Sequence, residues 1–170
     1  AYRRDTEELT VELTRREIDI PTITTTMLEN IAYLRFSDIS NNTSAHLDAA
    51  IRQANQERAQ ALVFDIRGLA SDNMEIIGDM LDTLVGKMTI IYAQDQQGEL
   101  QELMESDDAQ VELPMVVLAD NTTSGTWELF AQVLRDTGKA RTVGETTAGK
   151  GTRQSFYQLK NGAAVYLPEA

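Results

Sequence analysis

Three short apolar runs, separated by segments of helical spacing, constrain the fold of this chain most strongly. The runs lie at residues 61–64 (ALVF), within residues 87–93 (KMTIIYA) and within residues 114–121 (PMVVLADN). A run that is apolar on both faces is typical of a strand buried in a parallel sheet. Buried strands that alternate with helices indicate an α/β domain, and 170 residues suffice for one such domain around one core. We therefore expect a mainly parallel sheet flanked by helices.

Three other segments repeat apolar residues at helical spacing, and they lie within residues 42–54, 73–86 and 126–138. Thr43 or Ser44 is the expected N-cap of the first, and Gly138 is the expected end of the third. The residues expected to face the core are Leu47, Ile51 and Ala54 in the first, Met74, Ile77, Met80, Leu81 and Leu84 in the second, and Leu129, Val133 and Leu134 in the third.

The two ends of the chain have strand patterns. Apolar and polar residues alternate from Leu9 to Leu13 before Pro21, which predicts a strand followed by a linker. Residues 31–39 (IAYLRFSDI) predict a second strand. Two alternating runs joined by Asn161-Gly162 predict a β-hairpin near the C-terminal end. We assign residues 1–22 to the end of a preceding module and its linker, and residues 23–170 to the α/β core.

Charge and composition narrow the function. The formal net charge is −12, and such a field repels phosphate backbones, so we expect no nucleic-acid partner. Residues 94–112 are rich in Asp and Glu but lack regular ligand spacing, so we interpret them as a solvated insertion and expect no metal site. No apolar run is long enough for a transmembrane segment. No residue pattern calls for a cofactor.

The inventory of reactive side chains excludes several kinds of catalysis. The chain has no Cys, which rules out thiolate chemistry, and His46 is its single histidine. His46 falls in the first predicted helix, where we expect a surface or boundary position. A serine nucleophile in this chain would then need a base other than histidine, and a lysine of lowered pKa is the usual substitute.

The segment GETTAGKGT, residues 144–152, resembles a phosphate-binding loop at first sight. Such a loop needs Ser or Thr directly after its lysine and a helix that begins there, but Gly151 follows Lys150 and the next segment predicts a strand. A nucleotide site is therefore not expected. Glycines around a lysine between two strands favour either a lysine that enters a pocket and acts as a general base, or a surface lysine in a turn.

Residues 114–154, PMVVLADNTTSGTWELFAQVLRDTGKARTVGETTAGKGTRQ, resemble the catalytic core of the carboxyl-terminal processing peptidases, also called tail-specific proteases. Residues 8–21 resemble the last strand of the PDZ domain that precedes this core. The resemblance implies a ClpP/crotonase-like α/β core with a C-terminal β-hairpin. It also implies a serine nucleophile, Lys150 as base, and Gln154 orienting Lys150. Glu128 and Asp136 match acidic positions of the helix after the nucleophile.

This chain departs from the family pattern at two places. The nucleophilic serine is expected three residues before Glu128, where this chain has Gly125, and Ser124 lies one residue earlier. We name Ser124 as the candidate nucleophile. The family continues after its Asp-Ile-Arg-like strand end with an Asn-rich, Gly-Gly turn, whereas this chain has GLASDN from Gly68 to Asn73. Backbone N–H groups at Gly68 and Gly125 are the candidate oxyanion donors.

The resemblance implies a serine-type peptidase that acts on the C-terminal regions of polypeptides outside the cytoplasm. The alternative is a catalytically inactive homologue that binds peptides or serves in assembly, for example by adding an extended tail to a sheet edge. Crotonase-like enzymes of acyl thioesters share the fold, but no residue here supports that activity. The partner is a polypeptide in both remaining cases, and a homo-oligomer stays open.

Overall fold

A five-stranded sheet forms the centre of the structure, a computed structural model that describes residues 2–4, 7–9, 14–15, 18–95, 97–151 and 154–168. The strands are β1 (Tyr2–Arg4), β2 (Glu7–Leu9), β3 (Ile23–Leu28), β4 (Ile31–Phe36), β5 (Ala61–Asp65), β6 (Ala70–Ser71), β7 (Thr89–Gln94), β8 (Leu100–Glu105), β9 (Met115–Ala119), β10 (Ser124–Gly125), β11 (Ala140–Gly144), β12 (Gln154–Gln158) and β13 (Ala164–Pro168). The helices are α1 (Thr43–Gln56), α2 (Met74–Leu84) and α3 (Thr126–Asp136).

The central sheet has the strand order β11-β9-β5-β4-β3. Three of its four pairings are parallel, and only β3 runs antiparallel, beside β4. The carboxyl ends of β5 and β9 therefore lie side by side, with Asp65 opposite Leu118. The predicted mainly parallel α/β architecture is confirmed. Its functional consequence is that the turns after β5 and β9 meet at one edge of the sheet.

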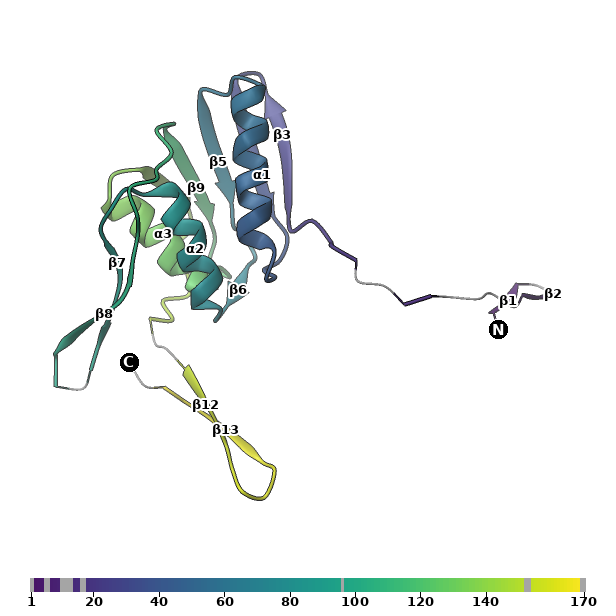
Figure 1. The fold of residues 1–170 in the computed structure, drawn as a ribbon, viewed down its shortest axis with the longest axis vertical. Helices are drawn as coiled ribbons and strands as arrows, with labels where there is room; N and C mark the ends of the chain where they lie inside the picture. Colours follow the sequence, from purple (N-terminus) through teal and green to yellow (C-terminus); the bar gives the residue numbers. More distant parts are fainter. Residues whose placement is uncertain are drawn as a thin grey trace.

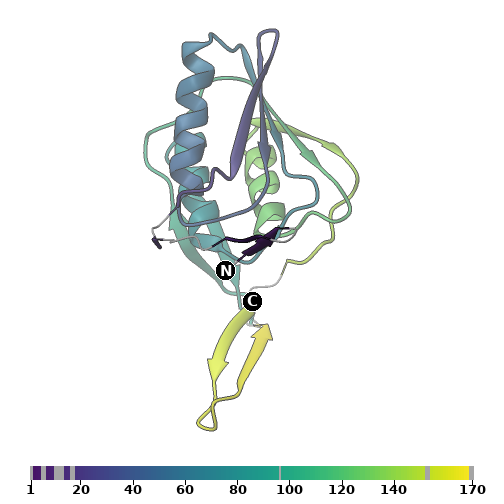
Figure 2. The ribbon, with the colours of Figure 1, turned by 90° about the vertical axis from the view of Figure 1, so that its right-hand side faces the viewer.

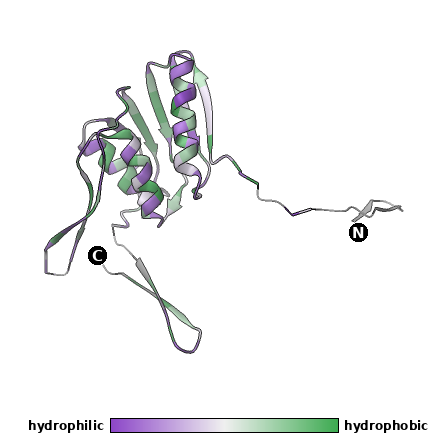
Figure 3. Ribbon diagram, viewed as in Figure 1, coloured by the Kyte–Doolittle hydropathy of each residue, from purple (hydrophilic) through white to green (hydrophobic). Residues whose placement is uncertain are grey.

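The three helices form one layer beside the sheet, as Figures 1 and 2 show. α1 contacts β3, α3 contacts β11, and α2 contacts both other helices. The predicted inward faces hold, since Leu47, Ile77 and Leu134 are fully buried. Four aromatic rings lock α3 to the sheet through tilted and edge-on contacts; they belong to Phe36, Phe64, Trp127 and Phe130. Figure 3 shows hydrophobic colouring along central strands such as β5 and β9, and helices banded in hydrophobic and hydrophilic colours.

Two hairpins extend from this body. β7 pairs only with β8 among the described residues and is not part of the central sheet, so the prediction of a further sheet strand at residues 87–93 is wrong in that respect. Its apolar residues Ile90 and Ile91 are buried in the shared core instead. β8 lies within residues 94–112, interpreted above as a solvated insertion, where no strand was predicted. β12 and β13 form the predicted C-terminal hairpin, with Gly162 in its turn at φ +84°.

Several local predictions need correction or stay untested. The N-cap of α1 is Asn42, one residue before the expected Thr43. The strand β3 was not predicted, although its run of Thr residues is β-branched. Leu9 ends β2, while Val11 and Leu13 lie outside the described residues. The assignment of residues 1–22 to a preceding module therefore stays a prediction. His46 occupies the expected boundary position and bonds Asp19 and the Thr22 N–H.

Candidate active site

The lysine loop, defined here as residues 145–151, follows β11 and returns to the start of α3. Gly144 allows the approach, because a Cβ there would lie 2.0 Å from the Ala119 carbonyl oxygen. The Glu145 N–H donates to the same oxygen at 3.2 Å, and the Ala148 N–H donates to the Thr123 oxygen at 3.0 Å. The loop leads into β12, a strand and not a helix, in agreement with the exclusion of a nucleotide loop.

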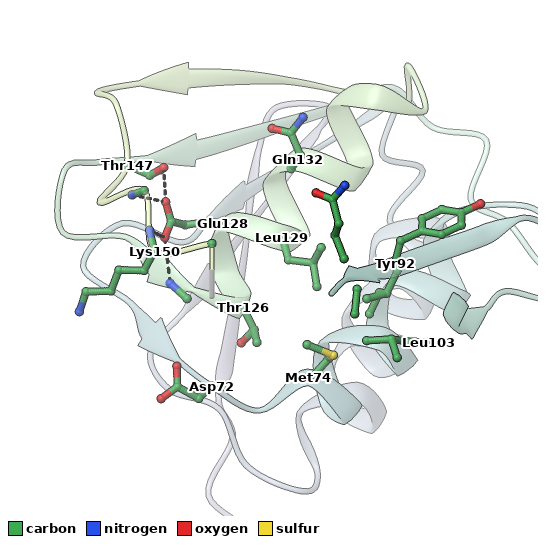
Figure 4. A pocket seen from close by; sticks show the side chains of 16 residues that line it. Asp72, Met74, Tyr92, Leu103, Thr126, Glu128, Leu129, Gln132, Thr147 and Lys150 are labelled. Atoms are coloured by element: carbon green, nitrogen blue, oxygen red, sulfur yellow. Dashed lines mark hydrogen bonds between the residues drawn. The ribbon is translucent and has the colours of Figure 1, made fainter. Parts of the chain in front are cut away.

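Glu128, in the first turn of α3, accepts four hydrogen bonds, three of them from this loop (Figure 4). Oε1 accepts from the Thr147 hydroxyl at 2.6 Å and from the Gly149 N–H at 2.7 Å. Oε2 accepts from the Lys150 N–H at 2.9 Å and from the Gly125 N–H at 3.0 Å. Burial favours the neutral acid, but these four bonds outweigh it and lower the pKa of Glu128.

The expected nucleophile position, Gly125, is closely covered by backbone. Its φ of +68° and ψ of −132° lie where side-chain-bearing residues are rare. A Cβ built on Gly125 would stand 2.1 Å from the carbonyl oxygen of Ser71, in strand β6. The cause is the short parallel pairing of β10 with β6, in which Gly125 lies opposite Ser71. In this arrangement no side chain fits at position 125.

The candidate dyad is not assembled in this conformation. Ser124 is buried, with 6% of its surface exposed, and its N–H donates to the Leu69 oxygen. Lys150 is exposed, which fits the surface-lysine alternative given above, and Figure 4 shows its amine directed outward from the loop. No hydrogen bond within the described part of the chain joins Ser124 to Lys150. Gln154 begins β12, and its side chain lies outside what the structure describes.

Both candidate oxyanion donors already have acceptors. The Gly68 N–H donates to Asp120 Oδ1 at 3.2 Å, and the Gly125 N–H donates to Glu128. The hydroxyl of Thr122 is the main cause that lowers the pKa of Asp120 to about 2, and the Gly68 N–H contributes. The oxyanion of a tetrahedral intermediate would have to displace both carboxylates from these N–H groups. The assignment of these two N–H groups as oxyanion donors stays a prediction, and neither group is free in this conformation.

A cavity of about 670 Å³ joins the lysine loop to the start of α3 and the β7–β8 hairpin. Gly125 and Lys150 line its polar end, and Met74, Leu103 and Tyr92 line its apolar end (Figure 4). A largely apolar cleft with a few polar groups at one end is the usual form of a ligand site. The nucleophile position and the candidate base thus face one cavity. No helix in the described ranges has the length and apolarity of a membrane span.

Comparison with known proteins agrees with this geometry. The model of peptidase family S41 matches residues 30–170. This chain belongs to peptidase family S41. A carboxyl-terminal-processing protease of a Picosynechococcus strain is 31% identical, covering 84% of this chain and 34% of that protein. The chloroplastic C-terminal processing peptidase of Tetradesmus obliquus is 26% identical, covering 95% of this chain and 38% of that protein.

The solved photosystem II D1 C-terminal processing protease shares the S41 fold with a TM-score of 0.79 and 24% identity, covering 92% of this chain and 44% of that chain. The chain spans about a third of the length of the curated relatives it matches. The predicted family and ClpP/crotonase-like fold class are thereby confirmed.

One cluster in this S41 core was missed from the sequence. The Arg67 guanidinium donates two hydrogen bonds, of 2.7 and 2.8 Å, to the Asp65 carboxylate, and the Tyr33 hydroxyl donates to the same carboxylate. The hydrogen bond from Arg67 is the largest cause that lowers the pKa of Asp65 to about 2. The bond from Tyr33 lowers it further, whereas burial acts in the opposite direction. The polar ending of residues 61–67 was the available signal. The cluster fixes the start of the turn that carries Gly68.

Proposed function

We propose that this chain is the core of a serine-type peptidase of the carboxyl-terminal processing class and acts on the C-terminal regions of polypeptides. The S41 match supports the class. The observation that carries the proposal is the shared cavity, because Lys150 and the first residues of α3 line it together. A polypeptide segment in that cavity would run past Lys150 and past Gly125, which directly follows the buried Ser124.

In this proposal the Ser124 hydroxyl attacks the scissile carbonyl carbon. Neutral Lys150 takes the hydroxyl proton and gives it to the leaving amine, and a water then hydrolyses the resulting ester. Gln154 orients the lysine. The step requires β10 to separate from β6, so that Ser124 becomes accessible and the Gly68 and Gly125 N–H groups can turn to the oxyanion. The conformation described above is then a closed resting state.

A second function, peptide binding without cleavage, is favoured by the closed position of Gly125. The Ser71 oxygen occupies the space that a nucleophile side chain would need there. The cavity and the edges of the sheet remain for an extended peptide, which could add to β11 or β3 as a further strand. This function needs neither a free oxyanion donor nor a paired lysine.

A labelling and binding experiment separates the two functions. A fluorophosphonate should label the wild type and fail to label Ser124→Ala or Lys150→Ala, and the wild type should cleave peptides near their C-termini. Calorimetry with the same peptides measures binding. Binding without label or cleavage would establish the second function and refute the first. A protein that neither binds nor cleaves would refute both.

The family supports a proposal for the partner and the location. We propose a polypeptide partner bound through its C-terminal region, and a location outside the cytosol, as the resemblance implies and as the name of the chloroplastic relative illustrates. A homo-oligomer is a further possibility that sedimentation of the purified protein would test. A single species at the mass of one chain would refute it.

A further inference from the structure

Glu128 does more than cap a helix. We propose that Glu128 is the positioning residue of the lysine loop, which it holds against the N-terminus of α3 so that Lys150 stays at the polar end of the cavity. The inference rests on the proposed function only in the role given to Lys150. Its structural content, that one carboxylate fixes this loop, can be tested without any activity.

The match between donors and acceptors carries the inference. A carboxylate offers about four acceptor sites, two on each oxygen. Here each oxygen takes two donors: Oε1 takes Thr147 and Gly149, and Oε2 takes Lys150 and Gly125. Three of these partners are N–H groups, which can only donate, and the Thr147 hydroxyl donates here as well, so the site fits an ionised carboxylate better than its neutral amide. An amide would place its NH₂ group against at least one of these N–H groups.

The rest of the loop does not replace this contact. Backbone bonds hold Glu145 to Ala119, at the end of β9, and Ala148 to Thr123, in the turn that follows β9. Thr147, Gly149 and Lys150 bond the α3 side only through Glu128 in the part of the chain that the structure describes. The Lys150 side chain is exposed, so its place depends on its backbone. Removing the carboxylate should therefore release residues 147–150 while the loop stays attached at both anchors.

The test measures amide hydrogen exchange at Gly149 and Lys150 in Glu128→Gln. Hydrogen bonds to charged groups are strong enough that we expect exchange to rise about tenfold to a hundredfold at one or both amides. Glu145→Gln is the matched control, with the same charge change in the same loop on an exposed side chain, and it should stay within about twofold of wild type. Thr147→Val should show a smaller rise, and Thr147→Ser should restore wild-type exchange.

A second readout reports on Lys150 itself. Acylation of Lys150, followed by mass spectrometry, should change its rate in Glu128→Gln but not in Glu145→Gln, with the exposed Lys87 and Lys160 as internal references. Unchanged exchange and unchanged acylation in folded Glu128→Gln would overturn the inference. These readouts do not need catalysis. If wild type fails to cleave peptides while Glu128→Gln frees the loop, the proposed function fails and this inference stands.

Discussion

A side chain introduced at position 125 should strongly destabilise the fold. In Gly125→Ala, the new Cβ would lie 2.1 Å from the Ser71 oxygen, and such contacts are essentially never shorter than 3.0 Å. The β10 and β6 backbones must therefore separate by about 0.9 Å. Overpacking of this kind costs about 1–3 kcal/mol. The positive φ of +68° adds about 1–3 kcal/mol, because the region is reserved for glycine.

We therefore expect Gly125→Ala to lower the free energy of unfolding by about 2–6 kcal/mol, a large part of the 5–15 kcal/mol usual for a domain. Urea unfolding followed through the fluorescence of Trp127, the single and fully buried tryptophan, measures it directly. Gly138→Ala is the control, since Gly138 has φ +72° but nothing within 4 Å of its added Cβ. The Gly138→Ala substitution should lower the free energy of unfolding only by the cost of a positive φ at alanine, about 1–2 kcal/mol.

The two variants together test the reasoning. Equal losses in Gly125→Ala and Gly138→Ala would show that the β6 backbone yields freely, and the closed position would be refuted. Gly125→Ser should then be compared, since it restores a hydroxyl at the position that the family pattern predicts. We expect it to be as unstable as Gly125→Ala and to gain no peptide hydrolysis. A stable Gly125→Ser that still hydrolyses peptides when Ser124 is also replaced by Ala would contradict the argument and show that the site opens easily.

Three further outcomes are expected. Asp65→Asn should lower stability near neutral pH by about 1–3 kcal/mol, since it leaves Arg67 without its carboxylate. The lowered pKa of Asp65 contributes stability above its unfolded value of 3.8 that is lost as pH falls toward about 2, so Asp65→Asn should flatten acid unfolding in that window. His46→Ala should lower stability by about 1 kcal/mol, because the Thr22 N–H loses its acceptor on the His46 ring. Thermal unfolding measures this loss, and an unchanged stability would refute a stabilising role for the bond. Ser124→Ala should abolish fluorophosphonate labelling yet unfold within about 1 kcal/mol of wild type, and labelling that persists would exclude Ser124 as nucleophile.

Strand type was predictable where local pattern and tertiary role agree. The apolar run at residues 61–64 became the centre of the sheet, and Asn161-Gly162 formed the turn of its hairpin. β7 shows the limit of this reasoning: its apolar residues are buried, but against the helices and β8 rather than in the parallel sheet. An apolar run indicates that a strand is buried, but it does not indicate which element the strand packs against. β8 was hidden because its apolar residues Leu100, Leu103 and Met104 do not alternate regularly with the polar residues of the strand.

The candidate site was less predictable, because its decisive features are contacts between segments distant in sequence. The family pattern pointed to Lys150, Gly125 and Gly68, and these residues do lie near one edge of the fold. It could not indicate that Ser71 covers Gly125, a contact across more than fifty residues set by the β6–β10 pairing. Nor could it indicate that Asp120 and Glu128 hold both oxyanion donors, since each bond depends on how two turns meet in space.

The lysine loop itself illustrates why a retained motif does not establish a retained reaction. Glu128 caps α3 and binds the loop with the same carboxylate, so the loop helps to complete the N-terminus of a core helix. A chain that lost its nucleophile would still need this contact for stability. The backbone course of the loop is thus explained by folding as well as by catalysis, although the Lys150 side chain takes no part in this contact. Position 125 distinguishes the two explanations. A nucleophilic side chain there would act in the reaction, whereas a glycine allows β10 to pack against β6.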